Sequence, residues 1–171
     1  MKKFFLSILM AILSFSTFAI VDFNGLKWGD GKNAVTPLFK DVKEEPSLKP
    51  NTEILVAKGN NENISNYKFY FKDNHLYKIR VCFNKETVGT NEIKGIYKKM
   101  TKNFGTPVSK APINKKVSSY TLRGNYLKFI PDLSTDVYYI GVDTVNDLGK
   151  MTDSNLYLDY VASNQENIPE I

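Results

Sequence analysis

Two side chains with nucleophile or base chemistry occur once each in the 171-residue chain, Cys82 and His75. A cysteine nucleophile needs a base within hydrogen-bonding reach, about 3 Å. The two residues stand at opposite ends of an alternating segment that predicts a strand, and at about 3.3 Å per residue their backbones lie about 23 Å apart. The sequence therefore excludes a Cys–His pair within one molecule. The neighbouring Asp73 and Asn74 assign His75 to a hairpin turn.

Metal, nucleotide and carboxylate chemistry have no matching motif. Zinc sites use three or four His, Cys or carboxylate ligands, and the acidic turn at 143–153 lacks the spacing of a calcium loop. No phosphate-binding glycine motif is present. We therefore expect no metal and no cofactor. A glycosidase needs two carboxylates, for which the chain offers candidates without a spacing that pairs them: Asp132, Asp136, Asp143 and Asp159.

The strongest candidate for binding is a predicted hairpin between Ser65 and Phe83. Apolar residues alternate with polar ones, and a three-residue loop at 73–75 aligns them on one face, with Phe71 opposite Tyr77. Such a loop requires Asn74 or His75 in the left-handed conformation. The second face then carries a basic patch around one tyrosine: Lys68, Tyr70, Lys72, Lys78 and Arg80. This patch fits an anionic partner, and an ordinary solvated lysine face is the alternative interpretation.

Two helices and six to eight strands are expected to position these residues. One helix starts near Thr36 with Pro37 in its first turn. The other covers Asn91–Phe104, with Ile93, Ile96, Tyr97, Met100 and Phe104 on its buried side. Strands are predicted at 52–58, 65–72, 76–83, 118–123, 126–130, 137–142 and 155–161, with loops at 43–51, at the polar segment holding Pro107 and Pro112, and at Gly124-Asn125.

Runs of strands after each helix predict an α+β fold with an antiparallel sheet and both helices packed on one face. The similar layout of the two halves also allows two tandem helix-plus-three-strand units. We expect one α+β domain over 20–162, with sub-units at about 23–83 and 90–161, and a polar tail at 163–171.

The first 19 residues have the three parts of an export signal. Lys2 and Lys3 precede an apolar run, and small residues precede a cleavage point after Ala19. An uncleaved membrane anchor is the alternative, because the run just reaches spanning length. Cleavage would lower the net charge from +5 to +3, too little for a nucleic-acid-binding domain. We expect a periplasmic or extracellular protein with no transmembrane span in the mature chain.

The opening segment Phe23-Asn24-Gly25-Leu26-Lys27-Trp28-Gly29 and the helix end Phe104-Gly105-Thr106-Pro107 resemble a loose group of small exported bacterial envelope proteins. The layout also resembles the tandem helix-plus-sheet units of beta-lactamase-inhibitor-protein-like and small outer-membrane-assembly-lipoprotein-like families. The chain lacks the lipid-anchor cysteine of the latter. The resemblance implies an interaction module and transfers no functional residue.

The sequence thus predicts an exported bacterial interaction module that binds a protein or an anionic envelope component without catalysis. A carboxylate-dependent hydrolase acting on envelope glycans and a purely structural envelope protein are the alternatives. One cysteine cannot close an internal disulfide. The free Cys82 therefore predicts either a thiol-reactive monomer or a disulfide-linked dimer, and the burial of Cys82 decides between these outcomes.

Overall fold

A computed structural model of the chain describes residues 23–47 and 49–163. The predicted export signal and residues 164–171 of the predicted tail lie outside these ranges. The elements, in chain order, are α1 (Lys32–Val35), β1 (Lys43–Glu45), β2 (Thr52–Lys58), β3 (Ile64–Lys72), β4 (His75–Phe83), α2 (Thr90–Phe104), β5 (Ser109–Val117), β6 (Tyr120–Phe129), β7 (Thr135–Asn146) and β8 (Met151–Ala162).

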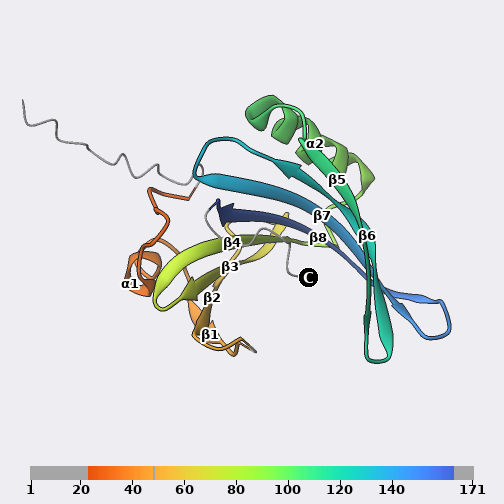
Figure 1. The fold of residues 1–171 in the computed structure, drawn as a ribbon, viewed down its shortest axis with the longest axis horizontal. Coiled ribbons are helices and arrows are strands. Elements are labelled where there is room, and N and C mark those ends of the chain that lie inside the picture. The colour runs from red at the N-terminus through yellow and green to blue at the C-terminus, as the bar shows by residue number, and fades with distance from the viewer. Residues whose placement is uncertain (1–22, 48, 164–171) are drawn as a thin grey trace, which may run out of the picture.

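The eight strands form one antiparallel sheet with the order β1-β2-β3-β4-β8-β7-β6-β5. This confirms the predicted α+β class and antiparallel sheet. Each half of the chain supplies a helix and then four strands, one strand more per half than the tandem-unit prediction. The halves join where β4 pairs with β8. Figure 1 shows α1 beside the turn between β3 and β4, and α2 beside the half of the sheet formed by β5 to β8.

The sequence places the first helix wrongly. α1 ends at Val35, before the Thr36-Pro37 pair that was expected to start it. Lys32 at its start donates its backbone N–H to the side chain of Asn74 (3.2 Å) in the turn between β3 and β4. This long-range contact fixes the helix in a place that the local pattern does not reveal. The predicted loop at 43–51 is also wrong in part, because it contains β1, a short exposed strand at the sheet edge.

The sequence also misplaces the strands after α2. The polar segment with Pro107 and Pro112, predicted as a loop, contains β5. Pro112 is tolerated within β5 because this strand lies at the edge of the sheet. The predicted turn at Gly124-Asn125 lies inside β6, and the turn between β5 and β6 holds Ser118, whose φ is 48°. Gly124 has a different role. A Cβ at this position would lie 2.0 Å from the carbonyl oxygen of Gly141, so the close approach of β7 excludes a side chain there.

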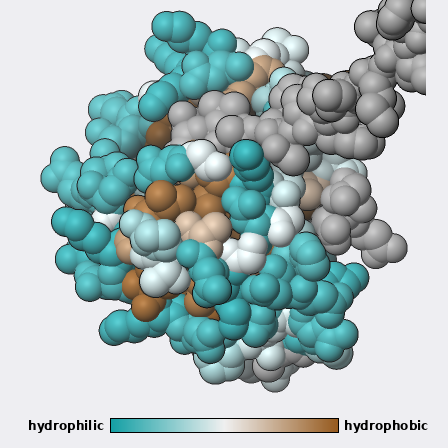
Figure 2. All heavy atoms as spheres, turned by 90° about the vertical axis from the view of Figure 1, so that its left-hand side faces the viewer, coloured by the Kyte–Doolittle hydropathy of each residue, from teal (hydrophilic) through white to brown (hydrophobic). Residues whose placement is uncertain are grey.

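Buried apolar side chains cover both faces of the sheet. The larger cluster includes Phe69, Ile79 and Phe129 of the strands together with Val35 of α1 and Met100 of α2. The smaller cluster lies on the other face and consists of Ile113, Tyr138, Ile140, Val142 and Val161. Viewed from the side of α1, hydrophobic residues gather in the middle of the surface and hydrophilic ones surround them (Figure 2). In the described ranges, no helix combines the length and the apolar character needed to cross a membrane.

Candidate functional site

The predicted hairpin forms, and its register is correct away from the turn. Phe69 pairs with Ile79, and Lys68 pairs with Arg80, as the alternation predicts. The predicted three-residue loop is wrong. The loop has two residues, Asp73 and Asn74, with φ values of 50° and 61°. Positive φ at both positions is the geometry of the tightest hairpin loops.

A β-bulge explains how a two-residue loop coexists with the expected register. Tyr70 pairs with Lys78, whereas the next pair joins Phe71 to Leu76, which leaves Tyr77 as the extra residue. A bulge inserts one residue and shifts the alternation by one place. The ring of Tyr77 then lies edge-on to that of Tyr70, with centroids 6.4 Å apart. The apolar pattern alone cannot distinguish this bulge from a longer loop.

We call the five predicted site residues, Lys68, Tyr70, Lys72, Lys78 and Arg80, the hairpin face. The structure brings them to one face of β3 and β4, but Lys78 and Arg80 are only 3% and 9% exposed. Both bind Asp159 of β8, which is fully buried. The Arg80 guanidinium donates two hydrogen bonds of 2.7 Å to its carboxylate, and Lys78 Nζ lies 3.0 Å from it. The centre of the predicted patch is therefore a buried ion triad.

Two of the three remaining residues of the hairpin face, Lys68 and Tyr70, are also engaged by neighbouring side chains. Lys68 forms a 2.6 Å ion pair with Glu45 of β1. The ammonium group of Lys78 lies over the ring of Tyr70, with Nζ 4.9 Å from the ring centroid. Lys72 is exposed. The face thus does not present the open group of cations that the sequence predicts.

The electrostatics of the triad favour its charged state. Burial alone would raise the pKa of Asp159, but the charges of Arg80 and Lys78 and their hydrogen bonds outweigh it and hold that pKa below the ordinary value. Burial also raises the pKa of Tyr70, so this hydroxyl stays neutral. Glycosidases need a general acid with a raised pKa, and Asp159 is shifted in the opposite direction.

The other candidate carboxylates are engaged as well. Asp136 forms a 2.9 Å ion pair with Lys128, and Asp132 accepts hydrogen bonds of 2.7 Å from the backbone and hydroxyl of Ser134. Asp143 accepts one of 2.7 Å from Ser154. Cys82 is buried, and His75 lies at the opposite end of β4. Within 23–47 and 49–163, no three potential metal ligands converge.

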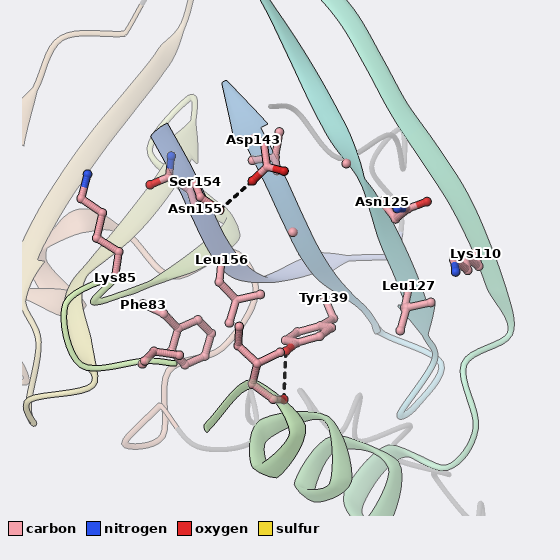
Figure 3. A pocket seen from close by; sticks show the side chains of 15 residues that line it. Phe83, Lys85, Lys110, Asn125, Leu127, Tyr139, Asp143, Ser154, Asn155 and Leu156 are labelled. Atoms are coloured by element: carbon pink, nitrogen blue, oxygen red, sulfur yellow. Dashed lines mark hydrogen bonds between the residues drawn. The ribbon is translucent and has the colours of Figure 1, made fainter. Parts of the chain in front are cut away.

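A hollow of about 520 Å³ lies between the start of α2 and the sheet, and we call it the α2 hollow. Figure 3 shows its lining, with Leu156, Phe83, Tyr139 and Leu127 near α2 and with Asp143 and Ser154 at the far end. The Tyr139 hydroxyl donates a 3.2 Å hydrogen bond to the backbone carbonyl of Ile93 and ties α2 to β7. Burial raises the pKa of Tyr139 to about 12. No local sequence pattern predicts this hollow, because it arises between segments far apart in the chain.

The outer side of α2 carries a second charged surface, which we call the lysine face: Lys94, Lys98, Lys99 and Lys102. Met100 on the opposite side of the helix is buried, so these lysines point to solvent. Glu92, the single acid in α2, accepts a hydrogen bond from the backbone of Gly89 (3.0 Å). Among the described residues, no ion pair involves the lysine face.

The helical periodicity of 91–104 already places these four lysines outside the apolar stripe, and a regional charge count strengthens that signal. Residues 90–131 hold nine Lys or Arg and one acidic residue, a net charge of +8, whereas residues 132–163 carry a net charge of −5. The modest charge of the whole chain hides this segregation. Three comparisons of the chain, with protein-family models, with curated proteins and with solved structures, return no match.

Proposed function

We propose that the chain is an exported interaction module that docks on the anionic lipid surface of the cell envelope through the lysine face of α2. The observation that carries this proposal is the row of Lys94, Lys98 and Lys102. These residues are four apart, so they lie along one side of the helix at steps of about 6 Å. The hairpin face is a weaker candidate, because Lys68, Lys78 and Arg80 already have acidic partners.

The energetics of α2 support an anionic partner. Like charges four residues apart destabilise a helix by about 0.2–0.5 kcal/mol per pair. This row contains two such pairs, and Glu92 is occupied by the helix start. An anionic surface would reverse the cost, since each lysine near it contributes about 1 kcal/mol of binding free energy.

A lipid surface fits this helix better than a soluble polymer because apolar side chains border the lysines. Ile93 and Tyr97 are 38% and 37% exposed although they lie on the side of α2 that faces the sheet. The apolar side of α2 packs on the sheet, so the lysines supply the attraction to anionic headgroups and the exposed parts of Ile93 and Tyr97 add apolar contact at the membrane interface. Protein capture without lipid binding would instead favour the protein-binding alternative.

Vesicle sedimentation tests the proposal. The mature protein is mixed with vesicles of phosphatidylethanolamine and phosphatidylglycerol, and separately with phosphatidylcholine vesicles. The triple substitution K94Q/K98Q/K102Q should lower the partition coefficient on the anionic vesicles on the order of 100-fold, at about 1 kcal/mol for each lysine.

The matched control K27Q/K40Q/K58Q removes the same charge from exposed positions away from α2. We expect at most a few-fold loss for it, because screening reduces the effect of distant charges. An equal loss in both variants, or equal binding of the wild type to both kinds of vesicle, would refute the assignment of the site to α2.

A further inference from the structure

Two glycines lie close together on the neighbouring strands β6 and β7, where Gly124 pairs with Val142 and Gly141 pairs with Asn125. Each position has glycine for a different structural reason. Gly124 must lack a side chain, because a Cβ would clash with the carbonyl of Gly141. Gly141 has no such constraint, since a Cβ there would meet no atom within 4 Å. Glycine inside a strand costs stability, and it often marks a place where a ligand approaches the backbone. The missing side chain of Gly141 leaves open space on the floor of the α2 hollow.

The part of the hollow next to α2 is apolar. Its walls are formed by six side chains from β4, the following loop, α2 and the second half of the sheet: Phe83, Val88, Ile93, Leu127, Tyr139 and Leu156. The volume of about 520 Å³ is within the range of small-molecule sites, about 300–1,000 Å³. Such a wall fits a flexible hydrocarbon chain, because the hydrophobic effect is non-directional and depends on the apolar area that is buried, not on one ligand shape.

Charged side chains at the rim of the α2 hollow, including Lys85, Lys110 and Asp143, determine which end group of a ligand fits there. Lys85 is paired with Asp153 at 2.7 Å. The Asp143 carboxylate accepts a hydrogen bond from the Ser154 hydroxyl. Asp143 is also the cross-strand partner of Arg123 on β6, and opposite charges in such positions attract. Lys110 of β5 is exposed, and no ion pair joins it to another described residue. The rim therefore has one cation without an acidic partner among the described residues.

We infer that the α2 hollow binds a single acyl chain that ends in an anionic group, with the chain over Gly141 and the anionic end at Lys110. The source of the ligand is a free fatty acid or an anionic lysolipid, which share this chemistry. The inference goes beyond the proposed docking surface. The two share Ile93, whereas Gly141 and Lys110 belong to the α2 hollow alone.

Titration calorimetry with three ten-carbon probes tests the polarity of the site. We expect decanoate to bind most tightly, decanol more weakly, and decyltrimethylammonium most weakly. Lys110→Gln should weaken decanoate binding roughly two- to five-fold, as expected for a partly exposed ion pair, and should leave decanol binding unchanged. A decyl lysophosphatidylglycerol probe that binds more tightly than decanoate would assign the ligand to lysolipids, and the reverse order to free fatty acids.

Gly141→Leu tests the position of the chain. The added side chain enters the open space and should weaken both decanoate and decanol about ten-fold or more, because it occupies the volume of the ligand. Ile93→Gln is a second variant at an exposed wall residue, so it does not depend on Leu being accommodated in β7. Leu133→Gln, at a 94% exposed position outside the lining, is its matched control and should bind as the wild type does.

The results separate this inference from the proposed function. K94Q/K98Q/K102Q should keep decanoate binding while it loses vesicle binding, and Gly141→Leu should do the reverse. Unchanged decanoate binding in both Gly141→Leu and Ile93→Gln, with folding confirmed by circular dichroism, would refute the inference. Binding of decyltrimethylammonium at least as tight as that of decanoate would refute the role of Lys110.

Discussion

Substitution of Asp159 by asparagine should destabilise the protein more than removal of any exposed charge. The carboxylate has 0% exposure and is shared by Arg80 and Lys78, with three contacts of 2.7, 2.7 and 3.0 Å. Removing one partner of a buried ion pair costs about 3–5 kcal/mol, because a buried charge loses its compensation. With a typical urea m-value of about 2 kcal/mol/M, the unfolding midpoint should fall by about 2 M.

Urea unfolding followed by circular dichroism and by tyrosine fluorescence measures this effect. Asp153→Asn is the matched control, since Asp153 forms a 2.7 Å ion pair with Lys85 at the surface, and exposed pairs contribute about 0–1 kcal/mol. A loss below about 1 kcal/mol for Asp159→Asn would refute the reasoning that the triad stabilises the junction of the two halves. Replacing Lys78, Arg80 and Asp159 together by Met, Met and Leu should be far less costly than the single change.

Three further outcomes follow from local features. Cys82 is buried, and desolvation raises its pKa to about 11, so only about one thiol in a thousand is ionised at pH 8. Ellman's reagent should therefore react slowly with the folded protein and faster after urea is added. A non-reducing gel should show monomer. Gly124→Ala should destabilise by about 1–3 kcal/mol through overpacking, whereas Gly141→Ala should be neutral or stabilising, which thermal unfolding can compare. The pKa of Asp159 is lowered in the folded protein. The stabilisation from its carboxylate is therefore complete above the pKa of the unfolded state, about 3.9, and is lost as the pH falls through the pKa of the folded state. The urea midpoint of the wild type should drop on acidification toward pH 3 more steeply than that of Asp159→Asn.

The sequence predicts elements well where local periodicity and packing agree. β2 has the predicted limits, and α2 begins one residue before its predicted start. The register of the hairpin follows from its alternation, because a slip would bury the polar side chains. Elements fixed by contacts between distant segments could not be predicted in this way. α1 depends on the turn at Asn74, and β5, which contains Pro112, depends on its edge position.

The candidate site shows the same limit more strongly. The alternation places Lys78 and Arg80 on one face correctly, but it cannot show that β8 brings Asp159 to them, since the β4–β8 pairing joins residues about eighty positions apart. A basic patch and a buried ion triad have the same local sequence. The α2 hollow has no local signal either, because only the pairing of β6 with β7 reveals that Gly124 is sterically required and Gly141 is not.

The junction between the halves has a consequence for folding. Six of the seven strand pairings join strands that are neighbours in the chain, and the β4–β8 pairing is the long-range exception. Hairpins form within microseconds. If each half assembles before the two meet, the edges of β4 and β8 are exposed until they pair. Open edges invite pairing with another copy of the chain, and charged residues that point inward suppress it. Lys78, Arg80 and Asp159 lie on these edges. The charges that join the finished sheet would then also oppose pairing of an exposed edge with another chain.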